Sequence, residues 1–195
     1  MFWWSQQPPL RDRRFQEAMV NYRQQEYAAA VASLNETIAQ DNRYGNAYLA
    51  RGCAALQQYE LVGFRGWLDA AFRDFTLAVR YGSSDEAQKA RAFCLVRMND
   101  FSMADLEYEA LVRHGFVTPD VLNNLAVVKM KLSVGPNLSA KEVEELLFES
   151  DRLLRSAIPD APDMWHLHLN LALLELKRFR TSNGDYLPHD GLISI

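Results

Sequence analysis

Small residues recur along this chain at intervals of 34, 40, 34 and 46 residues, and this recurrence limits what it can fold into. Each of them lies in an apolar stretch whose spacing predicts a helix. Because a small side chain lets two helices approach closely, their repetition predicts a series of helix pairs. The first helices of these pairs carry Ala18, Gly52, Ala92, Ala126 and Ala172, and the second helices carry Ala30, Ala71 and Ala104.

The pair around Gly52 preserves the pattern best. Its second helix carries Ala71, Phe75 and Ala78 at helical spacing, so we expect the ring of Phe75 to fill the gap left beside Gly52. This pair is about seven residues longer than the first pair. Helices are expected over residues 47–59 and 69–81, and the glycines between them predict either a longer loop or helices that extend around a bend.

Helix-start signals mark the later pairs. Ser83 with Glu86 and Ser139 with Glu142 have the spacing of a capping box. Thr118 precedes a proline and an acid, which predicts a hydroxyl cap at the start of a helix. A last helix, over residues 164–180, is apolar on nearly all sides, so we expect its outer face to be covered.

Composition narrows the classes of function. Apolar residues make up 49% of the chain and charged residues 24%, which is typical of a folded protein in water. The net charge of -4 argues against a nucleic-acid binder. The two cysteines lie in apolar helical stretches and are expected to be buried rather than paired. With no apolar run long enough for a membrane span or a signal peptide, the expected location is cytoplasmic.

The helix pairs resemble the tetratricopeptide repeat. The matching segments are residues 46–52 with 71–79, residues 99–104 with Tyr108, and residues 122–126. The resemblance covers roughly residues 11–180, leaving residues 1–10 and 181–195 as extended terminal segments. It implies an all-α, right-handed superhelix of about four helix pairs plus a C-terminal helix. The chain departs from the family in its two insertions and in lacking the usual proline at the repeat ends.

The resemblance also implies a concave groove, lined by first helices, that binds a peptide or helix of a partner protein. The residues expected to line this groove are Phe15, Met19, Tyr22, Leu49, Cys53, Leu56, Lys89, Phe93, Val96, Arg97, Asn123, Val127, Met130 and Lys131. The side chains are mostly apolar, which suits an apolar peptide or helix. The alternative is that the chain's own ends fill the groove, through residues 2–4 or 186–188.

Two further expectations concern specificity. Family members that grip a C-terminal carboxylate use a Lys, Asn and Arg set, and Phe15, Met19 and Ala50 occupy the equivalent places here, so this clamp is not expected. Phe64 and Trp67 lie in the longer second pair, where they are expected to form a partner-specific contact.

No residue set indicates catalysis. No nucleophile lies in a recognisable turn, and Gly63 and Gly66 lack the Lys and Ser or Thr of a phosphate-binding loop. His166 and His168 point to different faces of a helix and cannot easily share a metal. The sequence therefore predicts a protein-binding scaffold that is not an enzyme and needs no cofactor or metal. The alternative is an accessory segment of a larger signalling protein, such as a bacterial kinase, or a homo-oligomer built through the last helix.

Overall fold

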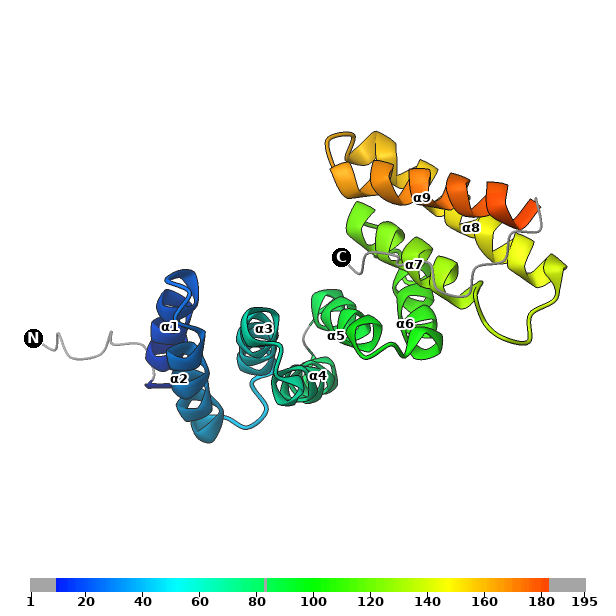
Figure 1. Ribbon diagram of the computed structural model, residues 1–195. Helices are drawn as coiled ribbons and strands as arrows, with labels where there is room; N and C mark the ends of the chain where they lie inside the picture. Colours follow the sequence, from blue (N-terminus) through cyan, green and yellow to red (C-terminus); the bar gives the residue numbers. More distant parts are fainter. Residues whose placement is uncertain (1–9, 83, 183–195) are drawn as a thin grey trace, which may run out of the picture. The chain divides into compact units, whose positions relative to one another are not determined.

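Nine α-helices make up most of the part of the chain that the structure, a computed structural model, describes (Figure 1). It describes residues 10–82 and 84–182. The Ser83 capping position and most of the expected extended ends lie outside these ranges, whereas Leu10, Thr181 and Ser182, also expected to be extended, belong to helices. The helices are α1 (Leu10–Arg23), α2 (Tyr27–Gln40), α3 (Gly45–Val62), α4 (Arg65–Arg80), α5 (Asp85–Arg97), α6 (Phe101–Arg113), α7 (Pro119–Leu132), α8 (Ala140–Ala157) and α9 (Trp165–Ser182), with a short 3₁₀ helix at Ile158–Asp160.

The chain divides into two compact units, residues 1–94 and 95–195, with the division inside α5. In the first unit α1 packs on α2, α2 on α3, and α3 on α4. In the second unit α6 packs on α7, α7 on α8, and α9 on both α7 and α8. Within each unit these helices therefore contact their neighbours in the sequence, as expected for a chain of helix pairs.

Most of the small residues expected where two helices touch are buried in the structure. Ala18, Gly52, Ala92 and Ala126 are buried, and so are the three alanines expected on second helices. At Gly52 the fit is close, because a Cβ there would lie 2.6 Å from Cε1 of Phe75. Phe75 is fully buried and occupies the expected gap. The exception is Ala172, which is exposed on α9.

The longer second pair consists of longer helices and not of a longer loop. α3 continues to Val62, and α4 begins at Arg65. Gly63 ends α3 with a positive φ of 68°, a left-handed conformation that glycine adopts without steric cost. The expected boundaries at residues 59 and 69 are therefore wrong, and the alternative of helices extended around a bend is confirmed.

Capping agrees with the sequence at α8 and differs at α7. Ser139 and Glu142 form the expected capping box, with each side chain hydrogen-bonded to the other residue's backbone N–H. The Thr118 hydroxyl does not cap α7. It donates to the carboxylate of Asp120 instead, because that acceptor lies within the same turn.

The last helix contributes polar groups to the interior of the second unit. The Nδ2 amide of Asn170 donates to Oδ1 of Asn123 at 2.8 Å. The ammonium of Lys177 donates to the carbonyl oxygen of Met130 at 3.1 Å. Both bonds run from α9 to α7, and the second places a positive charge near the C-terminal end of α7, where the helix dipole favours it.

Candidate functional site

An apolar pocket lies in the first unit, between α1, α2 and α3. Its volume is about 320 Å³, at the lower end of the range for ligand pockets. Five of the residues expected to line the groove surround it, from two first helices. The lining residues are Phe15, Met19 and Tyr22 of α1, Leu34 of α2, and Asn46, Leu49, Ala50 and Cys53 of α3.

Helical spacing explains why these side chains converge. On α1, Met19 and Tyr22 follow Phe15 by four and seven residues, so the three share one face. On α3, Leu49 and Cys53 are likewise four residues apart. Buried Ala18 brings α1 close to its neighbours, which places the two faces on either side of one hollow.

The pocket has aromatic walls and little polarity. Phe15 packs on Tyr44 with ring centroids 5.3 Å apart, and Tyr22 meets the edge of Tyr27 at the same distance. Burial raises the pKa of the Tyr22 hydroxyl, and Cys53 and Tyr27 add to the shift. None of the lining residues carries a charge at neutral pH, so the pocket suits an apolar side chain better than a carboxylate.

The thiol at the pocket is unreactive. Burial raises the pKa of Cys53 to about 11 and that of Cys94 to about 12, so both remain protonated at neutral pH. Both are free cysteines, as expected from the sequence. Cys53 therefore serves as an apolar lining residue and not as a nucleophile.

The other expected groove residues lie outside this pocket. Leu56, Lys89 and Phe93 are half-buried in the first unit, and the ammonium of Lys89 pairs with Glu86 at 2.8 Å. In the second unit four residues are half-buried, and burial lowers the pKa of Lys131. These four are Val96, Arg97, Val127 and Lys131.

Asn123 and Met130 are placed differently from expected. Both are only 2% exposed, because α9 packs on α7 and takes up their polar groups through Asn170 and Lys177. They are interior residues, and a partner cannot reach them without displacing α9.

Phe64 and Trp67, the two residues expected to form a contact in the longer second pair, lie in different surroundings. Phe64 is 66% exposed and folds over Gly66, where an added Cβ would collide with the Phe64 ring. Trp67 is half-buried and lines a second hollow of about 210 Å³ between α2, α3 and α4. Leu61 and Val62 are exposed near Phe64 in the sequence and add to an apolar surface at the end of α3.

Sequence reasoning missed two ion-pair clusters, each of which contains a buried charged side chain. In the first unit, Arg51 forms two hydrogen bonds to Asp74, at 2.8 and 2.6 Å, and a third to Asn35 at 2.7 Å. These bonds tie α3 to α4 and α2. The hydrogen bond to Asp74 raises the pKa of Arg51, which stays charged.

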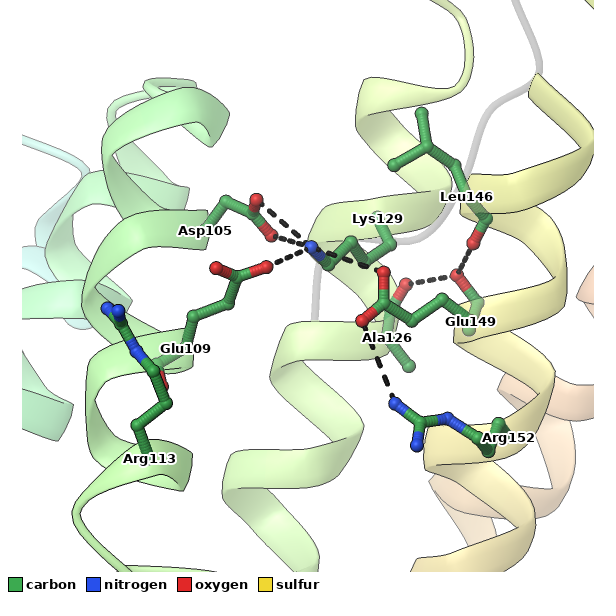
Figure 2. A network of polar contacts seen from close by, with 9 residues as sticks. Asp105, Glu109, Arg113, Ala126, Lys129, Leu146, Glu149 and Arg152 are labelled. Carbon is green, nitrogen blue, oxygen red and sulfur yellow. Dashed lines mark hydrogen bonds and ion pairs between the residues drawn. The ribbon is translucent and has the colours of Figure 1, made fainter. Parts of the chain in front are cut away.

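In the second unit, Lys129 of α7 lies among three carboxylates (Figure 2). Its ammonium is 3.0 Å from Asp105 and 2.5 Å from Glu109, both on α6, and 3.4 Å from Glu149 on α8. Lys129 itself is only 4% exposed. The signal in the sequence was a lysine three residues after the buried Ala126, on the face that should be apolar.

The charges around Lys129 shift its titration and that of Asp105. Burial alone would lower the pKa of Lys129, but hydrogen bonds to Glu109 and Asp105 outweigh it and raise the pKa. Burial raises the pKa of Asp105, although Lys129 acts in the opposite direction. The cluster joins three consecutive helices and lies away from the apolar pocket's helices in the sequence, so we assign it a structural role.

Two further features bear on function. Among residues 10–82 and 84–182, no three His, Cys, Asp or Glu side chains are arranged to hold a metal ion. None of the described helices combines the length and apolar content that crossing a bilayer requires.

Comparisons with known proteins identify the fold of the chain. No protein-family model and no curated protein sequence matches the chain. Several solved structures, however, match the chain in fold. A tetratricopeptide-repeat protein of Thermus thermophilus, TTC0263, aligns with a TM-score of 0.62 and 19% identity, over 85% of this chain and 81% of its own. MamA of Desulfovibrio magneticus RS-1 aligns with a TM-score of 0.70 and 12% identity, over 90% and 89%.

A third structure agrees with these two. A tetratricopeptide-repeat protein of Parabacteroides merdae aligns with a TM-score of 0.54 and 14% identity, over 89% of this chain and 77% of its own. Identities this low establish the fold and leave the partner open. The chain therefore has the all-α fold of tetratricopeptide-repeat solenoid proteins, as its repeated small residues predict.

Proposed function

We propose that the chain is a non-catalytic interaction module whose pocket between α1, α2 and α3 receives an apolar segment of a partner protein. The observation that carries this proposal is the convergence of Phe15, Met19, Tyr22, Leu49 and Cys53 on one uncharged hollow. Solenoid folds of this kind present extended surfaces for other proteins.

The chemistry of the lining defines the segment. A volume of about 320 Å³ accommodates a few apolar side chains, which matches the few anchors that dominate most peptide interfaces. Met19 adapts its shape easily, and the rings of Phe15 and Tyr22 offer flat apolar contact. We therefore assign the partner as a short amphipathic helix or extended peptide with two or three apolar anchors.

A second contact belongs to the same proposal. Phe64, with Leu61 and Val62, forms an exposed apolar surface at the end of α3, outside the pocket. Trp67, which lines the neighbouring hollow, completes the residues of the longer second pair. A partner that extends beyond the pocket would gain specificity from this surface, since most exposed apolar residues occur singly.

The experiment selects peptides from a displayed library on the whole chain and measures the best one by fluorescence anisotropy. Met19→Asp places a charge in the pocket and is expected to weaken binding at least tenfold. Val20→Asp, on the same helix but exposed and outside the pocket, is the matched control and should bind like the unmodified chain.

Two results would contradict the proposal. One is equal binding by the Met19→Asp and Val20→Asp chains with both helical by circular dichroism. The other is a selection that yields no peptide below about 100 µM in Kd, weaker than most specific peptide contacts. If a chain lacking residues 1–9 bound tightly where the full chain did not, the alternative of a groove filled by its own end would replace ours.

A further inference from the structure

The second hollow of the first unit, between α2, α3 and α4, lies on the other side of α3 from the apolar pocket. The two hollows share no lining residue. Arg51 and Ala55 line this hollow, and they lie two residues before and two residues after Cys53, which lines the pocket. At 100° per residue, this spacing places both about 160° away from Cys53 around α3. The hollow is therefore a separate feature of the surface.

The lining of this hollow combines apolar walls with positive charge. Val31, Ala55, Ala70 and Trp67 supply the apolar part, and two arginines, Arg51 and Arg73, supply guanidinium groups. The apolar pocket has no charged lining residue, so the two hollows select for different chemistry.

Asp74 is the one carboxylate in the lining, and it neutralises Arg51 alone. Its side chain is only 7% exposed, and its two oxygens accept hydrogen bonds from Nη2 and Nε of Arg51 at 2.6 and 2.8 Å. Arg73 is exposed on α4, and its side chain forms no hydrogen bond or ion pair with any other residue of the described ranges. The charge of Arg73 is thus left uncompensated.

The acidic side chains nearest to this hollow in the sequence are directed to other partners. Asp69, one turn before Arg73 on α4, lies 3.9 Å from Nε of Arg65. Glu36 of α2 pairs with Arg14 at 2.8 Å. The lining therefore keeps one net positive charge, although the whole chain carries a net charge of -4.

The guanidinium of Arg51 is a fixed donor at this hollow. It is bonded to Asp74 and to Oδ1 of Asn35, and its Cζ lies 5.5 Å from the centroid of the Tyr48 ring. The bonds among described residues use three of its five N–H groups, so two remain available. Because its side chain is 23% exposed, a ligand can reach them. Donors already held in place lower the cost of binding.

We propose that this hollow binds the carboxylate side chain of an acidic residue in a partner protein, with an adjacent apolar residue packed on Trp67. A carboxylate carries one negative charge, which matches the single uncompensated charge of Arg73, and its two oxygens suit guanidinium donors. A phosphate would bring nearly two negative charges and leave one of them unmatched. The proposal does not rest on the apolar pocket, since the two sites have no residue in common.

A nuclear magnetic resonance titration of the full chain with acetyl-Leu-Glu-Leu-amide tests the proposal. The indole N–H signal of Trp67, identified by its loss in Trp67→Phe, reports binding. At low ionic strength, where exposed charges are least screened, we expect a Kd on the order of 1 mM, because a tripeptide makes few contacts. The same peptide with glutamine in place of glutamate should bind about tenfold more weakly, because it lacks the charge.

A matched pair of variants tests the role of Arg73. Arg73→Gln should raise the Kd of the glutamate peptide about tenfold, to the level of the glutamine peptide. Arg80→Gln is the control, because it removes the same charge from an exposed arginine of α4 outside the hollow, about two turns away. It should leave the Kd unchanged. Both arginines are exposed, so both variants should keep the parent's circular dichroism.

Four results would overturn the proposal. The first is equal binding of the glutamate and glutamine peptides, and the second is an unchanged Kd in Arg73→Gln. The third is a Trp67 signal that neither peptide shifts at concentrations up to about 10 mM. The fourth is about tenfold tighter binding of acetyl-Leu-phosphoserine-Leu-amide than of the glutamate peptide, which would replace the carboxylate with a phosphate as the ligand.

Discussion

Replacing Lys129 with methionine should destabilise the protein more than any change to a surface charge. Methionine fills a similar volume but leaves Asp105, Glu109 and Glu149 without the cation that they share. Breaking a fully buried ion pair costs about 3–5 kcal/mol. Because the side chains of Glu109 and Glu149 are 38% and 37% exposed, we expect a loss at the lower end, about 3 kcal/mol.

Urea unfolding at pH 7, followed by circular dichroism, measures this loss. With slopes of about 1–3 kcal/mol per molar urea, the midpoint should fall by roughly 1–3 M. The loss should shrink as the pH falls from 7, because protonating Asp105 removes part of the repulsion within the cluster. Burial already raises the pKa of Asp105, so the folded chain binds that proton more tightly than the unfolded chain.

The stability of the unmodified chain should fall at high pH. The folded-state pKa of Lys129 is raised above its ordinary value of 10.5, despite burial, by hydrogen bonds to Glu109 and Asp105. A raised lysine pKa stabilises the fold fully below 10.5, and this stabilisation is lost as the pH rises through the folded-state pKa. The Lys129→Met chain should lack this loss.

Lys141→Met is the matched control, since the Lys141 side chain is 84% exposed and its ammonium lies 3.6 Å from Glu145 on the same helix. It should change stability by less than about 0.5 kcal/mol. If Lys129→Met were as mild as this control at pH 7, the buried cluster would not hold the three helices together and our reasoning would be refuted.

Gly52→Ala should lower stability by about 1–3 kcal/mol in thermal unfolding, because the added Cβ would lie 2.6 Å from the Phe75 ring; a variant as stable as the parent would contradict the tight contact. Ser139→Ala removes the capping box of α8 and should cost about 1 kcal/mol by the same measurement. The thiols of Cys53 and Cys94, whose pKa values are raised to about 11 and 12 by burial, should react with a disulfide reagent at pH 8 only after unfolding. Rapid labelling of the native chain would contradict this.

The sequence predicts helix pairing well because pairing depends on local chemistry. Ala18, Gly52 and Ala126 lie in apolar stretches of helical period, and small residues repeated at such intervals are typical of stacked helix pairs. The pocket residues of α1 and α3 follow from the same periodicity, since helical spacing determines which side chains share a face. That a partner binds them stays a prediction.

Other features depend on contacts between helices far apart in the sequence. Asn123 and Met130 have groove spacing, but α9, 47 residues later, covers them. Ala172 has the spacing of a close-contact residue, yet α9 presents its opposite face to α7 and α8. Lys129 looks like a solvated charge until α6 and α8 supply its three carboxylates. The partners that produce these outcomes do not follow from a single helix's own pattern.

The hydrogen bonds from Asn170 and Lys177 to α7 restrict how this chain can shorten over evolution. Within the part of the chain that the structure describes, α9 has no second helix of its own, and losing it would be neutral only if it satisfied no groups elsewhere. Its deletion would leave Oδ1 of Asn123 without its donor and remove the Lys177 cation from the end of α7. Loss of α9 would therefore destabilise α7, so the two helices depend on each other.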